Sequence, residues 1–213
     1  SIYRPSMSYS LVCTSFTKRE LSTIQRRPIR ALLSAMGYNR NMPLEIVYGP
    51  ISIGGIGLHH LYVEQGCQKV SALLQHIRQD SSLGKMMWIV IQWTQVTAGV
   101  GYAILSEPWR SLPQTDGQWF SSLCGFLADS ECTIEIANTY TVCTRRVHDR
   151  ILMEDAMTGD FTDSDIRAIN RCRLFLQVEC LSDICTADGL TTDPGLQAQP
   201  PKVSSQSTIA WPN

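Results

Sequence analysis

Glycines and histidines that could hold a phosphate or a metal ion lie together in the stretch GPISIGGIGLHHLY, residues 49–62. A dinucleotide-binding loop requires GxGxxG after a strand and an acidic residue about 20 residues later. Here His60 occupies the third glycine position, and the P-loop pattern is incomplete because Lys85 is followed by Met86. The glycines are therefore predicted to form a structural turn, since a residue without a side chain allows close backbone approach. The turn residues are Gly54, Gly55 and Gly57.

The histidines do not have the spacing of a metal site. His59 and His60 are adjacent, so on a helix their side chains would point about 100° apart. His76 and His148 lie far away in the sequence, and no HExxH or paired CxxC motif accompanies them. We expect no metal site, and we expect one of the two adjacent histidines to cap a helix or to lie on the surface.

The remaining catalytic patterns are also incomplete. Asp160, Asp163 and Asp165 lack the glycine and the glutamate that a calcium-binding loop needs at its sixth and twelfth positions, and helix capping explains these acids more simply. No GxSxG nucleophile motif is present. The sequence therefore predicts no catalytic residue and no cofactor in this segment.

Basic residues provide the clearest functional signal. Residues 1–50 contain seven Lys or Arg residues against two acidic residues, although the net charge of the chain is −1. Arginine binds phosphate oxygens in a bidentate manner, and the spacing of Arg19, Arg26 and Arg30 places them on one helix face. A solvated face without a partner is the alternative. The predicted phosphate contacts are Lys18, Arg19, Arg26, Arg27, Arg30 and Arg40, with Arg171 and Arg173 as additional candidates.

A helix over residues 18–36 would carry most of these residues. Thr17 and Glu20 form the sequence pattern of a capping box, and Gly37 is suited to the position after the helix end. Pro28 is expected to kink or split the helix. The predicted apolar face consists of Leu21, Ile24, Leu32 and Met36.

The rest of the chain reads as further helices, so the fold class is mainly α, an irregular bundle of about six helices with at most a short hairpin or strand. The second helix should bury Val63, Cys67, Val70, Leu74 and Ile77, and the third, over residues 84–98, should be central because it is apolar nearly all round. Asp116 should cap a helix that carries Trp119. The other expected elements are helices at 61–79, 145–157 and 166–184, an extended piece at 45–48 and a strand at 132–137.

Composition is ordinary for a globular chain, with 44% hydrophobic residues. None of the eight cysteines forms a CxxC pair, which favours reduced core residues of an intracellular protein. No signal peptide or long apolar run is present, so no membrane partner is expected. The first residue is Ser1, and the chain is expected to be a piece of a longer polypeptide.

The stretches FTKRELSTIQRRPIRALLSAMGYNRNMP and VYGPISIGGIGLHHLYVEQG resemble the segment that follows the polymerase core in non-LTR retroelement reverse transcriptases. These segments commonly have a helix with a central Ile-Gln, here Ile24-Gln25, and then a Gly-Gly-Leu-Gly turn, here residues 54–57 with Ile56 in place of Leu. LGKMMW, INRCRLFLQVECLSDI and AWPN are similar to the C-terminal part of such reading frames.

The resemblance implies the thumb and downstream region of an RNA-directed DNA polymerase. It implies a thumb-like helical region at 1–110 and a C-terminal helical region at 111–185. From Thr186 on, Gly, Pro, Gln and Ser dominate, and this composition predicts a disordered tail at 186–213. An RNA–DNA or DNA duplex and an upstream palm would be the partners, with Mg²⁺ in that palm and no catalysis in this segment. A helical protein-interaction module without nucleic-acid binding is the alternative, and an enzyme with an unrecognised site is a third reading.

Overall fold

The computed structural model describes residues 10–107, 112–115 and 117–197, and this part of the chain is mainly helical, as predicted. Pairing between extended segments is limited there to two isolated antiparallel bridges, Ile151 with Cys180 and Cys185 with Thr192. The α-helices are α2 (Lys18–Ala35), α3 (Leu44–Tyr48), α4 (Leu61–Arg78), α5 (Ser82–Ala98), α6 (Gln118–Asp129), α7 (Leu152–Thr158), α8 (Asp163–Leu176) and α9 (Leu181–Ile184). Two 3₁₀ turns are η1 (Ile51–Ile53) and η2 (Pro194–Gln197).

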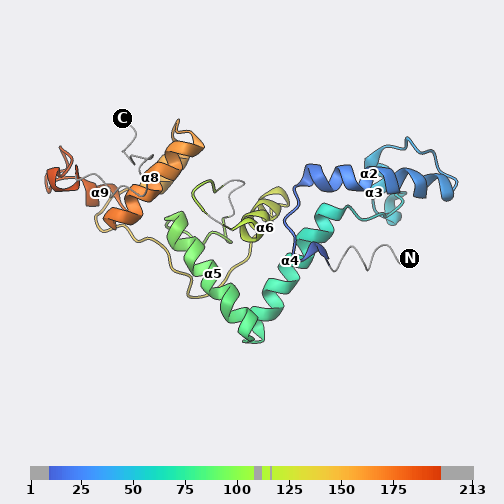
Figure 1. Ribbon diagram of the computed structural model, residues 1–213, viewed down its shortest axis with the longest axis horizontal. Coiled ribbons are helices and arrows are strands. Elements are labelled where there is room, and N and C mark those ends of the chain that lie inside the picture. Colours follow the sequence, from blue (N-terminus) through green and yellow to red (C-terminus); the bar gives the residue numbers. More distant parts are fainter. Residues whose placement is uncertain (1–9, 108–111, 116, 198–213) are drawn as a thin grey trace, which may run out of the picture.

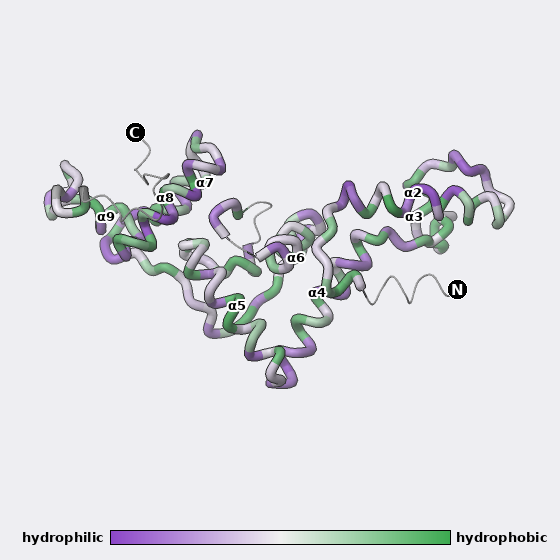
Figure 2. The backbone as a smooth tube through the Cα atoms, in the orientation of Figure 1, coloured by the Kyte–Doolittle hydropathy of each residue, from purple (hydrophilic) through white to green (hydrophobic). Residues whose placement is uncertain are grey.

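Helices α4 and α5 form the two sides of a V (Figure 1). Helix α6 packs against α4, while α2 and α3 extend from the N-terminal end of α4 as an arm. Helices α7, α8 and α9 lie beyond the C-terminal end of α5. The tip of the V, where α4 meets α5, is hydrophilic (Figure 2). The helices therefore form an elongated, angular chain of packed pairs.

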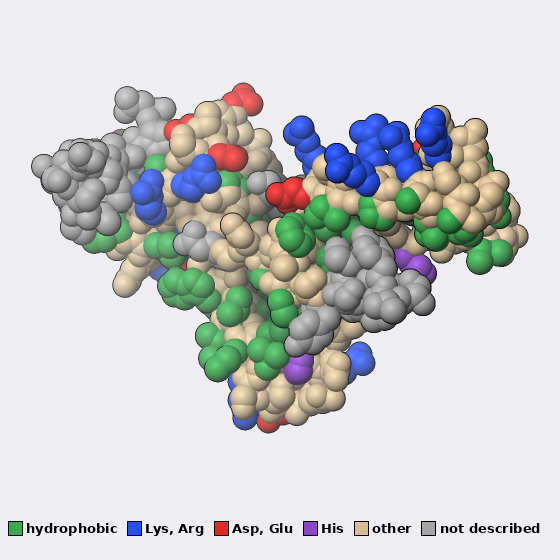
Figure 3. Space-filling view, turned by 45° about the vertical axis from the view of Figure 1, so that its right-hand side comes forward, with side chains coloured by type: hydrophobic (Ala, Val, Ile, Leu, Met, Phe, Trp, Pro, Cys, Tyr) green, Lys and Arg blue, Asp and Glu red, His purple; other side chains and the backbone are tan. Residues whose placement is uncertain are grey.

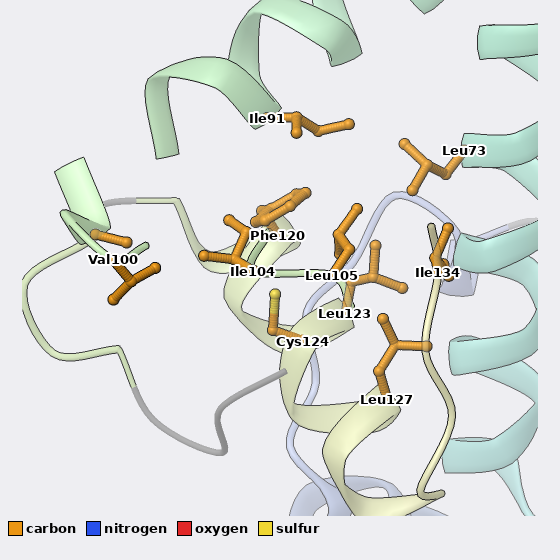
Figure 4. Packing of buried hydrophobic residues seen from close by; sticks show 11 residues of the cluster. Leu73, Ile91, Val100, Ile104, Leu105, Phe120, Leu123, Cys124, Leu127 and Ile134 are labelled. Atoms are coloured by element: carbon orange, nitrogen blue, oxygen red, sulfur yellow. The ribbon is translucent and has the colours of Figure 1, made fainter. Parts of the chain in front are cut away.

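The largest hydrophobic cluster fills the angle of the V. Leu73 of α4, Ile91 of α5 and Phe120 of α6 meet residues of the loop after α5, among them Ile104, which is 1% exposed (Figure 4). This cluster takes residues from both sides of the boundary expected at 110. The loop is thus part of the core.

A buried glutamine holds that loop in place. The Gln95 amide nitrogen donates to the carbonyl oxygens of Val100 (3.4 Å) and Tyr102 (2.7 Å), and its oxygen accepts from the Ile104 amide at 3.0 Å. Buried backbone groups need such partners, and here a side chain supplies them. Residues 132–137 form no strand, contrary to the prediction, although the Ile134 amide donates to the Leu105 carbonyl at 2.8 Å.

Helix α5 is only half buried, so the prediction of a central helix is wrong. Ile91 and Ala98 lie inside, whereas Met86, Ile89 and Trp93 are 63%, 65% and 64% exposed. The segment after α6 crosses α5, where Gln92 forms hydrogen bonds with Asn138 and Tyr140, but it leaves these three apolar side chains exposed.

Helix α4 has nearly the predicted bounds, but the predicted apolar face is only partly correct. Val63 and Cys67 are exposed, whereas Val70, Leu74 and Ile77 are partly buried against the core. The buried residues are Leu61, Gln65, Gly66, Lys69 and Leu73. Gly66 determines this face, because a Cβ atom there would lie 2.2 Å from the Phe126 ring of α6. Close packing of α6 therefore rotates the polar positions of α4 inward.

The C-terminal helices are shorter than predicted. The helix expected over 145–157 begins only at Leu152, because the preceding residues are drawn into backbone bonds with the segment after α8. The Leu181 amide donates to the Arg150 carbonyl, and the Leu152 amide donates to the Glu179 carbonyl. The helix expected over 166–184 is interrupted at Gln177, which has a left-handed backbone (φ 56°). This helix begins at Asp163, three residues earlier than predicted, and its Thr162–Asp165 capping box confirms that the acids there cap a helix.

The eight cysteines are all free, but only Cys124, Cys172 and Cys180 are buried. Burial raises the pKa of the Cys124 thiol to about 12, as expected for a core thiol that stays protonated. Four others are exposed, so the prediction of core cysteines holds for a minority. In the described part of the chain, no helix combines the length and apolarity needed to cross a membrane.

Lys69 is the most buried charged residue described, with 1% of its surface exposed. Its Nζ donates to the hydroxyls of Ser15 (3.3 Å) and Ser122, and it lies 5.4 Å from the centre of the Trp119 ring. None of the described carboxylates contacts the Lys69 ammonium group. Burial lowers the pKa of Lys69 from 10.5 to about 8, because the charged form is poorly solvated.

Replacement of Lys69 by Met should therefore stabilise the protein at pH 7 by about 1–2 kcal/mol, since the cost of burying an ammonium group is removed. Wild-type stability should rise as the pH increases from about 8 to 10.5, because in this window the unfolded state retains the proton that the folded state has lost. Chemical denaturation across this pH range measures both effects. The exposed Lys85→Met variant is the control, and an equal gain there would contradict the assignment.

Candidate nucleic-acid interface

Helix α2 has the predicted ends. The Thr17 hydroxyl accepts from the Glu20 amide at 3.2 Å, and the Glu20 carboxylate accepts from the Thr17 amide at 2.8 Å. At the other end Gly37 has φ 79°, and the Tyr38 amide donates to the Leu33 carbonyl at 2.8 Å, which is a Schellman motif. Pro28 lies inside α2 and does not split it, although a proline there removes one hydrogen bond of the helix.

The apolar face predicted for α2 is partly wrong. Leu21 is buried, but Ile24, Leu32 and Met36 are 40%, 43% and 48% exposed. The buried stripe repeats every four residues and consists of Leu21, Gln25, Ile29 and Leu33. The buried stripe thus includes the polar residue Gln25. The helix is therefore rotated about its axis relative to the orientation that the apolar residues alone predicted.

Gln25 holds α2 against the start of α4. Its side-chain nitrogen donates to the His59 carbonyl at 2.6 Å, and its side-chain oxygen accepts from the Leu61 amide at 2.9 Å. Gln25 is 6% exposed, so both bonds are shielded from water and both ends of the amide are satisfied. One side chain therefore connects the central Ile-Gln of α2 with the end of the glycine turn.

The segment before that turn is helical, not extended as predicted for residues 45–48. The short helix α3 is possible because the turn folds back onto its end. The amides of Ile56 and Leu58 donate to the carbonyls of Ile46 and Val47 at 2.8 and 3.0 Å. Carbonyl groups at a helix end need such donors.

Glycines make this return possible, as the sequence predicted. Gly54 and Gly57 have φ angles of 88° and 72°, which other residues rarely adopt. A Cβ atom at Gly55 would lie 2.1 Å from the Gly49 carbonyl oxygen. The turn therefore brings the backbone of Gly55 so close to that of Gly49 that a side chain would not fit between them. Within the described residues, no group of three or more His, Cys, Asp or Glu side chains could hold a metal ion.

His60 is the residue that caps α4, and His59 is exposed, as predicted for one of the pair. The His60 Nδ1 accepts from the Tyr62 amide at 3.1 Å, and the ring packs edge-on against Tyr48 with centroids 4.9 Å apart. Burial and the charge of Lys18 lower the pKa of His60 below 6.5. The capping nitrogen is an acceptor only in the neutral ring.

Five predicted phosphate contacts form an open basic surface. Four lie on α2 and Arg40 lies on the loop before α3, and all are exposed. Their guanidinium groups make no hydrogen bond or ion pair with any other described residue. A row of Lys and Arg side chains follows one side of the arm (Figure 3). We call Arg19, Arg26, Arg27, Arg30 and Arg40 the basic row.

Lys18 lies differently from the basic row. Its Nζ is 3.8 Å from the Asp129 carboxylate and 5.6 Å from the centre of the Tyr62 ring. These contacts connect α2 to α4 and α6. Lys18 is 66% exposed at its side chain, so its charge remains near the row while part of it is neutralised by Asp129.

Arg173 is not available to a phosphate, so its prediction as an additional contact is wrong. It is 2% exposed and donates to the carbonyls of Val96 (2.6 Å) and Thr97 (3.2 Å) at the end of α5. A Cβ atom at Gly99 would lie 2.7 Å from its guanidinium carbon, so glycine is needed there. Arg171 is exposed. Asp116, the predicted cap of the helix with Trp119, lies outside the described residues.

Two adjoining hollows border the basic row. The inner one, about 400 Å³, lies between α2 and residues 40–48. The outer one, about 540 Å³, shares Arg30, Arg40 and Asn41 with it. The inner hollow is lined by Arg26, Arg30, Arg40, Met42, Leu44 and Tyr48, among others. Comparisons with protein-family models, curated proteins and solved structures found no match.

Sequence reasoning did not find the groups that shape this region. Gln25, Tyr48 and Asn41 were not among the predicted site residues. One signal could have indicated Gln25, because it lies four residues after Leu21 and four before Ile29, in a stripe that is otherwise apolar. The hollow itself depends on where the loop at 40–43 returns to α2, and no local pattern encodes that position.

Replacement of Gln25 by Ala should lower the free energy of unfolding by about 1–3 kcal/mol, because the His59 carbonyl and the Leu61 amide would lose their partner in a buried place. Urea denaturation measures the change. Gln75→Ala on the exposed side of α4 is the matched control. If Gln75→Ala lowered the free energy of unfolding as much as Gln25→Ala, the two hydrogen bonds of Gln25 would have no special role in stability.

Stability should fall as the pH drops from 7 to 5, because the pKa of His60 is lowered by folding and the unfolded state takes up a proton first. Asn accepts a hydrogen bond at every pH, so His60→Asn should reduce this pH dependence. Thermal unfolding at several pH values measures it. His59→Asn removes an exposed histidine and should leave the dependence intact, and loss of the dependence in both variants would contradict the assignment to His60.

Proposed function

We propose that this chain is the thumb and downstream segment of a mobile-element reverse transcriptase and that it grips an RNA–DNA or DNA duplex through its backbone. The observation that carries the proposal is the basic row on α2 and the following loop, whose guanidinium groups have no partner among the described residues. Lys18 lies at the edge of the proposed contact surface and is included in it. The resemblance of the Ile-Gln helix and the glycine turn to that family supports the same assignment.

The spacing of the row suits a phosphate backbone. Arg19, Arg26 and Arg30 share one face of α2, and at the usual rise they lie roughly 10 and 6 Å apart along its axis. Arginine side chains are long enough to adjust these separations to successive phosphates, and phosphate contacts position a duplex without reading its sequence. Such a surface fits binding that is independent of sequence.

Local acids do not neutralise the row. Glu20 is held in the capping box, where its hydrogen bonds to Thr17 lower its pKa. The other acid in residues 18–48 is Glu45, on α3. The positive field of the arm is therefore open to a polyanion, which would release its counterions on binding.

The proposal assigns nucleotide transfer to an upstream palm with its Mg²⁺ and assigns no catalytic residue to this segment. Two metal ions in such a palm would stabilise the attacking and leaving oxygens. The role of this chain's own residues is to hold the duplex while the chemistry takes place elsewhere.

A second candidate function is a helical protein-interaction module. The observation that favours it is the exposed apolar side of α5, where Met86, Ile89, Val90 and Trp93 recur at helical spacing. Exposed apolar surfaces of this kind mark interaction sites in many proteins. The two candidates differ in salt dependence, because an apolar interface is not weakened by salt.

Binding to a labelled RNA–DNA duplex across a salt series tests the proposed function. The variant with Arg19, Arg26 and Arg30 all replaced by Ala should bind more weakly, and its log–log salt slope should be smaller by about 2–3, since each phosphate contact contributes about 0.9. Fluorescence anisotropy measures both quantities. The matched control replaces Arg78, Lys85 and Arg146, three exposed cations away from α2, by Ala.

Equal losses in the two triple variants would mean that general charge, and not the basic row, determines binding. Absence of binding by the wild type at low salt would contradict the proposed function and would favour the interaction module.

A further inference from the structure

The hollow beside the basic row has two chemically different sides. Arg30, Arg40 and Asn41 stand where the inner and outer hollows join. The inner hollow continues to Leu44 and Tyr48, which provide an apolar wall and a flat ring. Its volume of about 400 Å³ lies in the range of about 300–1,000 Å³ that is usual for ligand pockets.

The polar groups at this place lack protein partners. The guanidinium groups of Arg26, Arg30 and Arg40, the side-chain amide of Asn41 and the hydroxyl of Tyr48 make no hydrogen bond to another described residue. No acidic residue lines either hollow. These groups are complementary to a ligand that carries a negatively charged group, which the guanidinium groups would bind, and other hydrogen-bond acceptors, which the amide and the hydroxyl would bind.

The apolar side has a fixed shape. The Tyr48 ring is held edge-on against His60, with ring centroids 4.9 Å apart. Met42 and Tyr48 are both partly buried and pack against the cluster of Ile29, Leu33 and Val47. Leu44, at the first position of α3, is 56% exposed and borders the opening. A planar group could rest on these side chains.

We propose that this groove binds one unpaired nucleotide of the nucleic acid, with its phosphate at Arg30 and Arg40 and its base against Leu44 and Tyr48. The inference rests on the proposed function and refines it. Arg19, Arg26 and Arg27 of the basic row face the duplex backbone, Arg30 lies where the duplex ends, and the groove takes the first unpaired nucleotide beyond that end. Base-on-aromatic contacts are tolerant of sequence because every base has a flat face.

The experiment compares three labelled ligands that share one RNA–DNA duplex. One is blunt, one has a short single-stranded overhang, and one has an abasic overhang of the same length. The two overhangs carry the same phosphates, so their affinity ratio isolates the contribution of the bases. The wild type should prefer the overhang with bases by about tenfold, the size expected for one stacked base.

Leu44→Ser removes the apolar wall without changing charge and should reduce this preference severalfold, while blunt-duplex affinity stays the same. Leu83→Ser is the matched control, because Leu83 is 45% exposed in the first turn of α5 and lies away from the groove. Arg40→Ala should weaken both overhang ligands alike, because it acts on the phosphate.

Equal affinity of the wild type for the two overhangs would overturn the inference and leave the duplex grip standing. A preference that survives Leu44→Ser would also overturn it, because the base would then bind elsewhere. If the blunt duplex shows no salt-sensitive binding, the proposed function fails, and the inference that rests on it fails too.

Discussion

The amide of Gln25 is the contact on which the N-terminal arm depends. It bonds the His59 carbonyl and the Leu61 amide at once, on either side of the residue that caps α4. Helix α2 is thereby fixed in position and in rotation relative to α4. The rotation matters because it turns Leu33 inward and Arg26 and Arg30 outward along the rim of the groove. A helix held only by apolar contacts could rotate by part of a turn at little cost.

The same device recurs through the chain. Gln65 donates to the Thr14 carbonyl at 3.1 Å, Gln95 holds the loop after α5, and Arg173 holds the end of that helix. Because the described residues contain no sheet, segments that cross the core need other partners for their backbone groups. Long polar side chains on the helices supply these partners. This explains why buried polar residues interrupt stripes that periodicity alone would expect to be apolar.

Charge is distributed in a way that leaves the arm basic. Several acids are held in bonds within the C-terminal region: Asp165 accepts from the Thr162 amide in the capping box of α8, and Asp149 accepts from the Ser182 amide and hydroxyl. Arg150 pairs with Asp155, whereas no acid in the described part of the chain pairs with the basic row. The arm therefore offers cations and the outer side of α5 offers apolar groups, two surfaces that would suit different partners.

Local sequence determined the capping boxes of α2 and α8 and the glycine turn. The Thr17–Glu20 and Thr162–Asp165 pairs satisfy amides within one turn of the chain, and Gly54 and Gly57 adopt angles that other residues avoid, so neither feature needs a distant partner. The tertiary structure decided what periodicity could not. Gly66 against Phe126 and Gln25 against the start of α4 chose the buried faces, because a close contact or a buried hydrogen bond outweighs a few exposed apolar side chains. The tertiary structure also decided the different roles of the arginines. Arg173 is buried because it donates to the carbonyls at the end of α5, whereas the arginines of the basic row face solvent. The sequence alone does not distinguish these two uses of one side-chain type.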